Sequence, residues 1–289
     1  MNDIEFEVLR NFLKARSGLA LTPDKRYLVE SRLGPVCTRF KLGTLSRLIA
    51  ELKNGRAIEL EKTVVEAMTT NETFFFRDKV PFDIFQDVLL PRYLKERAST
   101  KRLRIWCAAA STGQEPYSLA MLLNDAAAKL AGWSVELIAT DISTEVLEKA
   151  KAGIYNQFEV QRGLPIRLMM KHFTNTGDQW RISREIRSMV DFRQLNLIQD
   201  FSRLGQFDII YCRNVLIYFD LPTKTDVFRR LAKALAPDGS LVLGASETVL
   251  GITDAFTLDP AYRGLYVKAD PKAAGAQVPL ARPALAGVR

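Results

Sequence analysis

The sequence predicts an α/β domain preceded by a separate all-helical segment, with a small β-rich insertion inside the α/β part. From Asp3 to Ala67, apolar residues recur at helical spacing. From about residue 103 onward, short apolar runs alternate with longer amphipathic segments, which is typical of βαβ units. Because 289 residues exceed what one hydrophobic core usually supports, we expect two domains.

The first 70 residues are expected to form a domain of several short helices. Gly18 stands where a first helix would stop, and Thr22-Pro23 is a start signal for the next one. A break at Gly43-Thr44 separates a third helix. We therefore assign residues 1–70 to this domain and residues 71–79 to a linker.

Residues 80–269 are expected to form the α/β domain. Helical stretches at about 115–131, 143–151 and 222–236 connect short apolar runs that we expect to be strands. These runs are Leu103–Cys107, Val135–Thr140, Met189–Phe192, Phe207–Cys212, Leu241–Ala245 and Leu265–Val267. The segment 153–189 alternates like a small hairpin and is interpreted as an inserted β-subdomain. Residues 270–289 lack periodicity and are expected to be a flexible tail.

Composition narrows the class of protein. The chain is 47% hydrophobic and 26% charged, as in ordinary globular proteins, and no run of 18 apolar residues suggests membrane insertion. Its three cysteines are scattered, which argues against a disulfide framework or a metal cluster and favours the cytoplasm. The net charge of +8 favours an acidic partner, and eight Lys or Arg against two Glu lie between Lys25 and Arg56.

Two features suggest a nucleotide-like ligand at the carboxyl edge of the expected sheet. Small residues from Ala108 to Gly113 follow the first strand and lead into a helix, which leaves room for close backbone approach, although a plain tight turn would look the same. The second strand ends at Asp141, where this architecture pairs a carboxylate with ribose hydroxyls. Asp141 also precedes a helix, so a capping role is an alternative.

Three consecutive aromatic residues, Phe74 to Phe76, lie between Asn71, Thr73 and Arg77 in the expected linker. This pattern suits neither an amphipathic helix nor a solvated loop. We interpret it as a pocket wall; the alternative is that the aromatic rings fill the interface between the two domains.

Five sequence blocks together resemble the chemotaxis receptor methyltransferase (CheR) family. In chain order they are NETFFFRD, AAASTGQEPYSLA, TDISTEVLEKAKAGIY, FDIIYCRNVLIYF and APDGSLVLGASET. The resemblance spans about Asp3 to Lys268. It implies a Rossmann-like S-adenosylmethionine methyltransferase sheet, preceded by the helical domain, that methylates glutamate side chains of chemoreceptors and releases S-adenosylhomocysteine.

The resemblance also implies site residues. Asn71, Thr73 and Arg77 match linker contacts to the cofactor, Glu115 matches an acid at its methionyl end, and Asp141 matches the ribose-binding acid. The remaining matches are Asn196 and Leu197 near the adenine, and Arg213 and Asn214 at the end of the fourth strand. Tyr218 and Arg162 are weaker candidates at the substrate opening, since an aromatic residue there is more often core packing.

The chemistry requires no general base, because a glutamate nucleophile is already ionised at neutral pH. Chemoreceptor helices carrying several carboxylates would suit the basic segment, with Arg26, Arg32 and Arg39 as candidate contacts and Arg32 matching the receptor-facing position. We expect Arg32→Glu to slow receptor methylation and leave cofactor affinity nearly unchanged. The stretch Asn175–Gln179 looks short for docking a receptor C-terminal pentapeptide, so we expect no dependence on one.

Two alternatives stay open at this stage. A nucleic-acid methyltransferase would fit the basic charge, but the sequence lacks an aromatic–Pro motif for a flipped base and any RNA-binding module. A cofactor-binding signalling module without turnover is the second alternative, and the intact motif matches weigh against it. Nothing such as a heptad seam demands more than a monomer.

Overall fold

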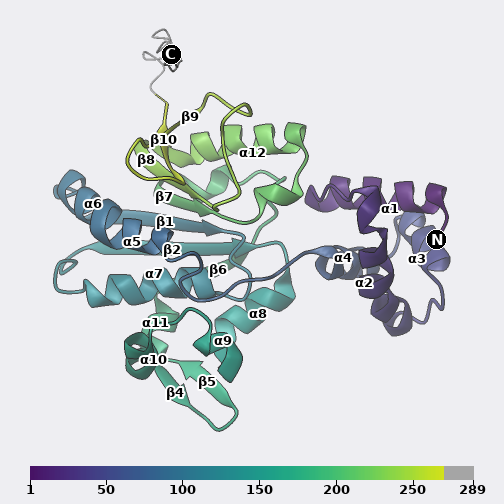
Figure 1. Ribbon diagram of the computed structural model, residues 1–289, viewed down its shortest axis with the longest axis horizontal. Helices are drawn as coiled ribbons and strands as arrows, with labels where there is room; N and C mark the ends of the chain where they lie inside the picture. The colour runs from purple at the N-terminus through teal and green to yellow at the C-terminus, as the bar shows by residue number, and fades with distance from the viewer. Residues whose placement is uncertain (270–289) are drawn as a thin grey trace, which may run out of the picture.

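The computed structural model describes residues 1–269, so the expected tail at 270–289 lies outside the described residues. The chain forms an all-helical unit followed by an α/β unit, as predicted (Figure 1). No helix among residues 1–269 is both long enough and apolar enough to cross a bilayer.

Four helices make up the N-terminal unit, namely α1 (Asp3–Ser17), α2 (Arg26–Arg39), α3 (Leu45–Asn54) and α4 (Ile58–Met68). Asn2 begins α1 through a capping box with Glu5, and Gly18 ends it in the left-handed conformation. The four helices share a hydrophobic cluster of their own, built from residues such as Leu9, Leu33 and Val64. A separate cluster is consistent with a unit that packs independently.

The α/β unit is a seven-stranded sheet in the order β6-β2-β1-β7-β8-β10-β9. The strands are β1 (Arg102–Ala108), β2 (Ser134–Asp141), β6 (Val190–Gln194), β7 (Phe207–Cys212), β8 (Leu235–Leu243), β9 (Phe256–Leu258) and β10 (Leu265–Lys268). The first five pair in parallel, whereas β10 runs antiparallel to both β8 and β9. The short edge strand β9 was not among the predicted strands.

Helices cover both faces of this sheet (Figure 1). They are α5 (Val80–Ile84), α6 (Leu90–Glu96), α7 (Gln114–Asp125), α8 (Thr144–Ala152) and α12 (Leu221–Ala234). A π-turn at Phe85–Leu89 joins α5 to α6. The expected helix 115–131 ends early, at Asp125, and turns lead into β2.

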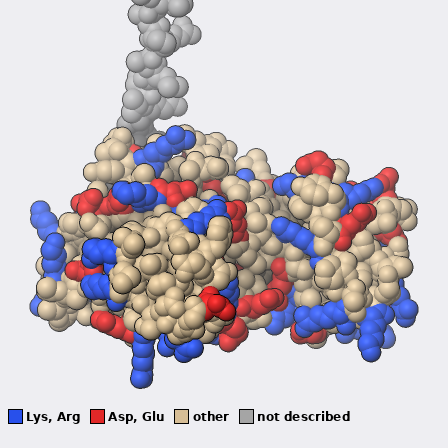
Figure 2. Space-filling view, turned by 60° about the horizontal axis from the view of Figure 1, so that its bottom comes forward, with Lys and Arg blue, Asp and Glu red and all other residues tan. Residues whose placement is uncertain are grey.

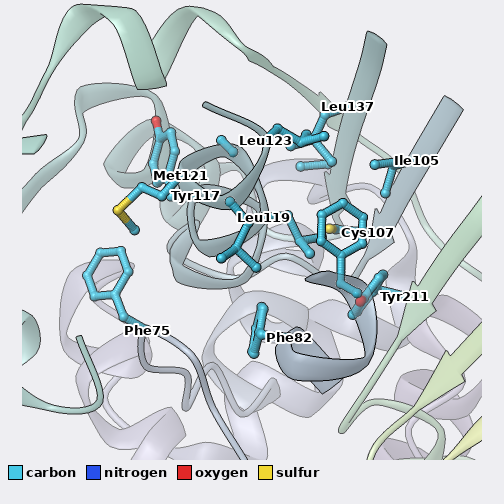
Figure 3. Close-up of a cluster of buried hydrophobic side chains, with 14 of the residues drawn as sticks. Phe75, Phe82, Ile105, Cys107, Tyr117, Leu119, Met121, Leu123, Leu137 and Tyr211 are labelled. Atoms are coloured by element: carbon cyan, nitrogen blue, oxygen red, sulfur yellow. The ribbon is translucent and has the colours of Figure 1, made fainter. Parts of the chain in front are cut away.

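The linker aromatics do not fill the interface between the two units. Phe75 is fully buried in the core of the α/β unit, where its ring meets the rings of Tyr155 and Phe173 at 5.1 and 5.5 Å. Figure 3 shows Phe75 and Phe82 pointing into the same cluster as Tyr117 of α7. The linker is therefore anchored to the α/β unit rather than packed between the units.

The insertion is larger than the expected hairpin. It holds a three-stranded antiparallel sheet in the order β3-β5-β4, together with three short helices. Its elements are β3 (Ile154–Asn156), α9 (Gln157–Gln161), α10 (Ile166–His172), β4 (Phe173–Asn175), β5 (Gln179–Ile182) and α11 (Arg184–Ser188). The prediction missed β3, because three residues are too few to show an alternating pattern.

Candidate functional site

The loop after β1 runs through backbone conformations that bring its peptide groups close to the edge of the sheet. Ala109, Ser111 and Gly113 all have positive φ, at 66°, 50° and 94°. A Cβ at Gly113 would lie 3.0 Å from the Cβ of Ala150 and 3.1 Å from the ring of Tyr117, so only glycine fits there. The conformation of the loop therefore requires glycine at position 113.

Asp141, the last residue of β2, lies beside this loop with 6% of its surface exposed. Its Oδ2 accepts a hydrogen bond from the Ser111 backbone N–H at 2.8 Å, and its Oδ1 accepts one from the Ser143 N–H at 3.0 Å. Burial raises the pKa of this carboxyl, although the backbone hydrogen bonds oppose that rise. Asp141 therefore joins two loops and keeps further acceptor positions.

Arg213 forms a buried charge network at the end of β7. Its Nη1 donates to Oε2 of Glu115 at 2.7 Å, and its Nη2 donates to Oδ2 of Asp78 at 2.7 Å and to the Arg77 carbonyl at 2.8 Å. Its Nε has no hydrogen-bond partner among residues 1–269. Burial raises the pKa of Glu115, and the neighbouring Arg213 charge opposes that rise.

Glu247 supports the backbone beside the cleft, a role that the sequence did not reveal. Its two carboxylate oxygens accept hydrogen bonds from the backbone N–H groups of Gly244, Asn214, Val215 and Leu216, at 2.8 to 3.0 Å. These bonds hold the segment after β7 in place, with Asn214 at a φ of 57°. The acidic residue after a Gly-Ala-Ser stretch was a visible signal, but three of its four partners lie more than 30 residues away.

Two adjoining cavities of about 510 and 630 Å³ form one cleft at the carboxyl edge of the sheet. Seven residues line both cavities: Thr69, Thr70, Ala109, Asp141, Ile142, Val215 and Tyr218. One cavity is mainly apolar, with Leu19, Leu197 and Phe219, whereas the other is charged, with Arg77, Glu115 and Arg213. The cleft therefore suits a ligand with one apolar end and one zwitterionic end.

The structure brings all nine predicted cofactor residues into this cleft. Asn196 and Leu197 line the apolar cavity, and Asp141 lines both cavities. The charged cavity is lined by the other six, Asn71, Thr73, Arg77, Glu115, Arg213 and Asn214. Tyr218 borders both cavities, whereas Arg162 lines neither: its Nη2 donates to Oε1 of Glu72 at 2.6 Å, and its guanidinium lies 4.4 Å from the centre of the Phe74 ring.

The N-terminal helical unit closes one side of the cleft. The Ala20 N–H donates to the Tyr218 carbonyl at 2.8 Å, and Leu19 forms an antiparallel bridge with Phe219. Asn196 donates from its side-chain amide to the Arg16 carbonyl at 2.7 Å. Both units therefore contribute to the walls of one site.

The three arginines expected to face a receptor differ from one another. Arg39 is exposed, with its guanidinium 5.7 Å from the centre of the Phe40 ring, and Arg26 donates to Oδ1 of Asp3 at 2.6 Å. Arg32 instead is partly buried, and its guanidinium donates to Met68, Thr69 and Thr70. A side chain so engaged does not project as a free cation, and contact of Arg32 with a receptor stays a prediction.

Comparisons with known proteins agree with the expected resemblance. Residues 71–264 match the family described as "CheR methyltransferase, SAM binding domain", and residues 4–69 match "CheR methyltransferase, all-alpha domain". Chemotaxis protein methyltransferase 1 of Vibrio cholerae is 43% identical over 272 residues, which cover 93% of this chain and 98% of the relative. The Escherichia coli chemotaxis protein methyltransferase is 35% identical over 263 residues, 89% of each chain.

The likeness to solved structures is remote. A DhpI–SAH complex is 17% identical, with a TM-score of 0.30, and the match covers 67% of this chain and 76% of that one. This likeness adds nothing to the assignment, which rests on the two family matches and the sequence relatives. Together with the two-part cleft between the helical and α/β units, they show that the chain belongs to the CheR family of S-adenosylmethionine-dependent chemotaxis protein methyltransferases.

Proposed function

We propose that the protein transfers the methyl group of S-adenosylmethionine to glutamate carboxylates on the cytoplasmic helices of chemoreceptors, and that it acts in the cytoplasm as a monomer. The observation that carries the proposal is the cleft that is apolar at one end and charged at the other, with Asp141 between the two. S-adenosylmethionine has the same division, with an adenosine end and an amino-acid end joined at a sulfonium. The residues present therefore fit this cofactor.

Asp141 is proposed to hold the ribose. A carboxylate has about four acceptor positions, and the backbone N–H groups of Ser111 and Ser143 use two of them. The remaining positions suit the two ribose hydroxyls. Asn196 and Leu197 are proposed to flank the adenine, because they line the apolar cavity on the far side of Asp141.

The charged end of the cleft is proposed to bind the methionyl group. Arg77 uses one N–H on the Glu72 carbonyl at 2.6 Å, which leaves donors for a bidentate bond to the cofactor carboxylate. Glu115 is proposed to accept from the ammonium while Arg213 holds it in position. Asn71, Thr73 and Asn214 complete this end of the cleft.

The chain's own contribution to the chemistry is alignment. A bound S-adenosylmethionine would supply an electrophilic methyl group on a sulfonium. An ionised glutamate carboxylate would bond to that methyl carbon as the C–S bond breaks, and neutral S-adenosylhomocysteine would be the leaving group. The carboxylate needs no deprotonation at neutral pH, so the site needs to position it and exclude water. Tyr218 lines both cavities beside Asp141, and we propose that it borders the opening through which the glutamate enters. Arg162 is proposed to hold the linker through Glu72, outside that opening.

A basic surface on the helical unit is proposed to steer the receptor. Figure 2 shows Lys and Arg side chains gathered along the lower edge of this unit. Arg39 has an exposed side chain, and Arg26 keeps about 38% of its side chain exposed beside Asp3. Such a surface would attract a carboxylate-rich helix at long range and would lose strength in salt.

We further propose that the protein does not depend on a receptor C-terminal pentapeptide. Only residues 176–178 connect β4 to β5, and the turn is tightened by the Thr176 N–H, which donates to the Gln179 carbonyl at 2.8 Å. The edge strand β4 has three residues, which gives a peptide strand little to pair with. Isothermal titration calorimetry with a receptor C-terminal pentapeptide should give no signal at micromolar concentration; binding in that range would contradict the proposal.

A methyl-transfer assay tests the proposed function. The purified protein and S-adenosylmethionine labelled in the methyl group are incubated with a chemoreceptor cytoplasmic fragment or with total RNA. Label should enter the fragment as a base-labile methyl ester and should fall when its surface glutamates are changed to glutamine. Label in RNA would favour a nucleic-acid methyltransferase. Cofactor binding without label in either acceptor would favour a signalling module without turnover.

A further inference from the structure

Arg32 lies on α2, but its side chain contacts residues at the end of α4, next to the cofactor cleft. Its Nη1 donates to the Met68 carbonyl at 2.8 Å and to the Thr69 carbonyl at 3.1 Å, and its Nη2 donates to the Thr70 hydroxyl at 3.2 Å. All three acceptors lie more than 30 residues away in sequence, at the point where α4 ends and the linker begins.

The two carbonyl acceptors lie at the end of a helix, where carbonyl groups lack hydrogen-bond donors from the helix itself. Met68 is the last residue of α4 and Thr69 is its C-cap, so their carbonyl oxygens have no partner within the helix. The guanidinium supplies donors in a fixed fork, and its positive charge is favourable at the carboxyl end of a helix. Arg32 therefore fixes the direction in which the chain leaves α4.

The direction in which the chain leaves α4 determines the position of one wall of the cleft. Thr69 and Thr70 line both the apolar and the charged cavities, and Asn71 follows them into the charged one. The Asn71 carbonyl accepts from the Ser111 hydroxyl at 2.8 Å, so the linker is tied to the β1 loop on its other side. The segment from Thr69 to Asn71 is thus held at one end by Arg32 and at the other by Ser111.

We infer that Arg32 is a positioning residue of the cofactor site, which sets the Thr69–Thr70 wall against the bound S-adenosylmethionine. The inference concerns cofactor binding and does not depend on the identity of the methyl acceptor. It also means that the Arg32 side chain connects α2, which carries the exposed Arg39, to the segment that lines the cofactor cleft.

Two substitutions of Arg32 and one matched control separate this role from a surface contact. Arg32→Lys keeps the charge but cannot span the three acceptors with one ammonium, and Arg32→Ala removes both charge and donors. Arg39→Ala is the control, because it removes the same charge from the same helix without touching the linker. The fold of each variant is checked by its melting temperature without ligand.

Calorimetric titration with S-adenosylmethionine and S-adenosylhomocysteine, without any methyl acceptor, is the primary measurement. Both Arg32 variants should bind each ligand about threefold to tenfold more weakly than the wild type, whereas Arg39→Ala should bind as the wild type does. With a chemoreceptor fragment, Arg32→Lys should raise KM for S-adenosylmethionine and leave kcat at saturating cofactor nearly unchanged, a split that general loss of stability would not produce.

The result that overturns the inference is unchanged cofactor affinity in Arg32→Lys. If Arg32→Ala does not fold, Arg32→Lys carries the test alone. Failure of wild-type receptor methylation would count against the proposed function, but it would leave the calorimetric result standing, so the two failures can be told apart.

Discussion

At the scale of single residues, the buried carboxylates of this protein organise the backbone around the site. Glu247 accepts four backbone N–H groups, Asp141 accepts two, and Glu115 pairs with Arg213. Each carboxylate thereby compensates the cost of its burial, which an unpaired charge could not do. The geometry of the cleft therefore depends on acids that need not all touch the cofactor.

Glu247→Gln tests this role at a residue not proposed to bind the cofactor. Each carboxylate oxygen of Glu247 accepts hydrogen bonds from two backbone N–H groups. In glutamine, a side-chain NH2 group, which is itself a donor, would replace one of these oxygens and face two backbone N–H donors. We expect the free energy of unfolding to fall by about 2–3 kcal/mol, measured by urea denaturation. S-adenosylmethionine should also bind more weakly, since Asn214 and Val215 line the cleft.

Glu145→Gln is a suitable control, because it makes the same change from carboxylate to amide at an exposed position. Its effect on the free energy of unfolding should stay within about 0.5 kcal/mol. Equal stability of the Glu247→Gln variant and this control would show that the four hydrogen bonds do not stabilise the segment after β7.

At the scale of elements, the inserted β-subdomain is attached to the α/β core through buried side chains. Tyr155, Ile182 and Ile186 belong to the same hydrophobic cluster as α7. Gly163 lies so close to the linker that a Cβ there would stand 2.1 Å from the Phe75 carbonyl. The subdomain therefore supports the linker that lines the cleft, besides any role in binding partners.

His172 makes the stability of this subdomain depend on pH. It ends α10, is 3% exposed, and its Nε2 has no hydrogen-bond partner among residues 1–269. Burial lowers the pKa of His172 from its ordinary value of 6.5, and the Lys171 charge adds to that shift. Below about pH 6.5, His172 binds a proton in the unfolded chain more readily than in the folded chain. The free energy of unfolding is therefore highest above that pH and decreases as the pH falls.

His172→Phe should flatten this dependence, because a buried ring without a titrating nitrogen replaces the imidazole. Urea denaturation of the wild type and the variant at pH 7.5, 6.5 and 5.5 gives the comparison. The difference in slope cannot exceed about 1.4 kcal/mol per pH unit, the limit for one proton. Parallel pH profiles would contradict the prediction.

The sequence predicted those parts of the fold and the site that follow from local pattern. The small-residue loop after β1 and the acid at the end of β2 could be found because both lie where any parallel sheet presents its carboxyl edge. The contacts of Arg32 and most of those of Glu247 could not, since these partners are 31 to 38 residues distant and nothing local selects them. The strand β3 was missed because its three residues show no alternating pattern and its partner β5 follows only after α9, α10 and β4.

At the scale of the whole molecule, the cofactor cleft exists only while the helical unit and the α/β unit keep their present arrangement. Ser17 and Leu19 belong to one unit, and Leu197 and Phe219 belong to the other, yet all four line one cavity. Two further contacts join the units: Lys14 pairs with Asp220 at 2.5 Å, and Glu66 accepts from Thr144. Cofactor binding should therefore stabilise the junction by linkage.

Glu66 offers the sharpest test of that junction. Its Oε1 accepts from the Thr144 backbone N–H at 2.7 Å and from the Thr144 hydroxyl at 3.0 Å, so a carboxylate from α4 sits at the first turn of α8. A negative charge is favourable at the amino end of a helix. Glu66→Gln removes the charge and should increase the fraction of molecules in which the two units have separated.

Only the arrangement with the two units in contact offers both walls of the cleft, so the apparent Kd for S-adenosylmethionine rises in inverse proportion to the fraction of molecules in that arrangement. We expect an increase of about threefold to tenfold, measured by calorimetry. Glu59→Gln, on an exposed position of the same helix, should leave the Kd unchanged. A double-mutant cycle with Thr144→Val should be non-additive, because both changes break the same contact. Additive effects would mean that the loss of cofactor affinity does not arise from the contact between Glu66 and Thr144. They would contradict the prediction that this contact between the two units supports cofactor binding.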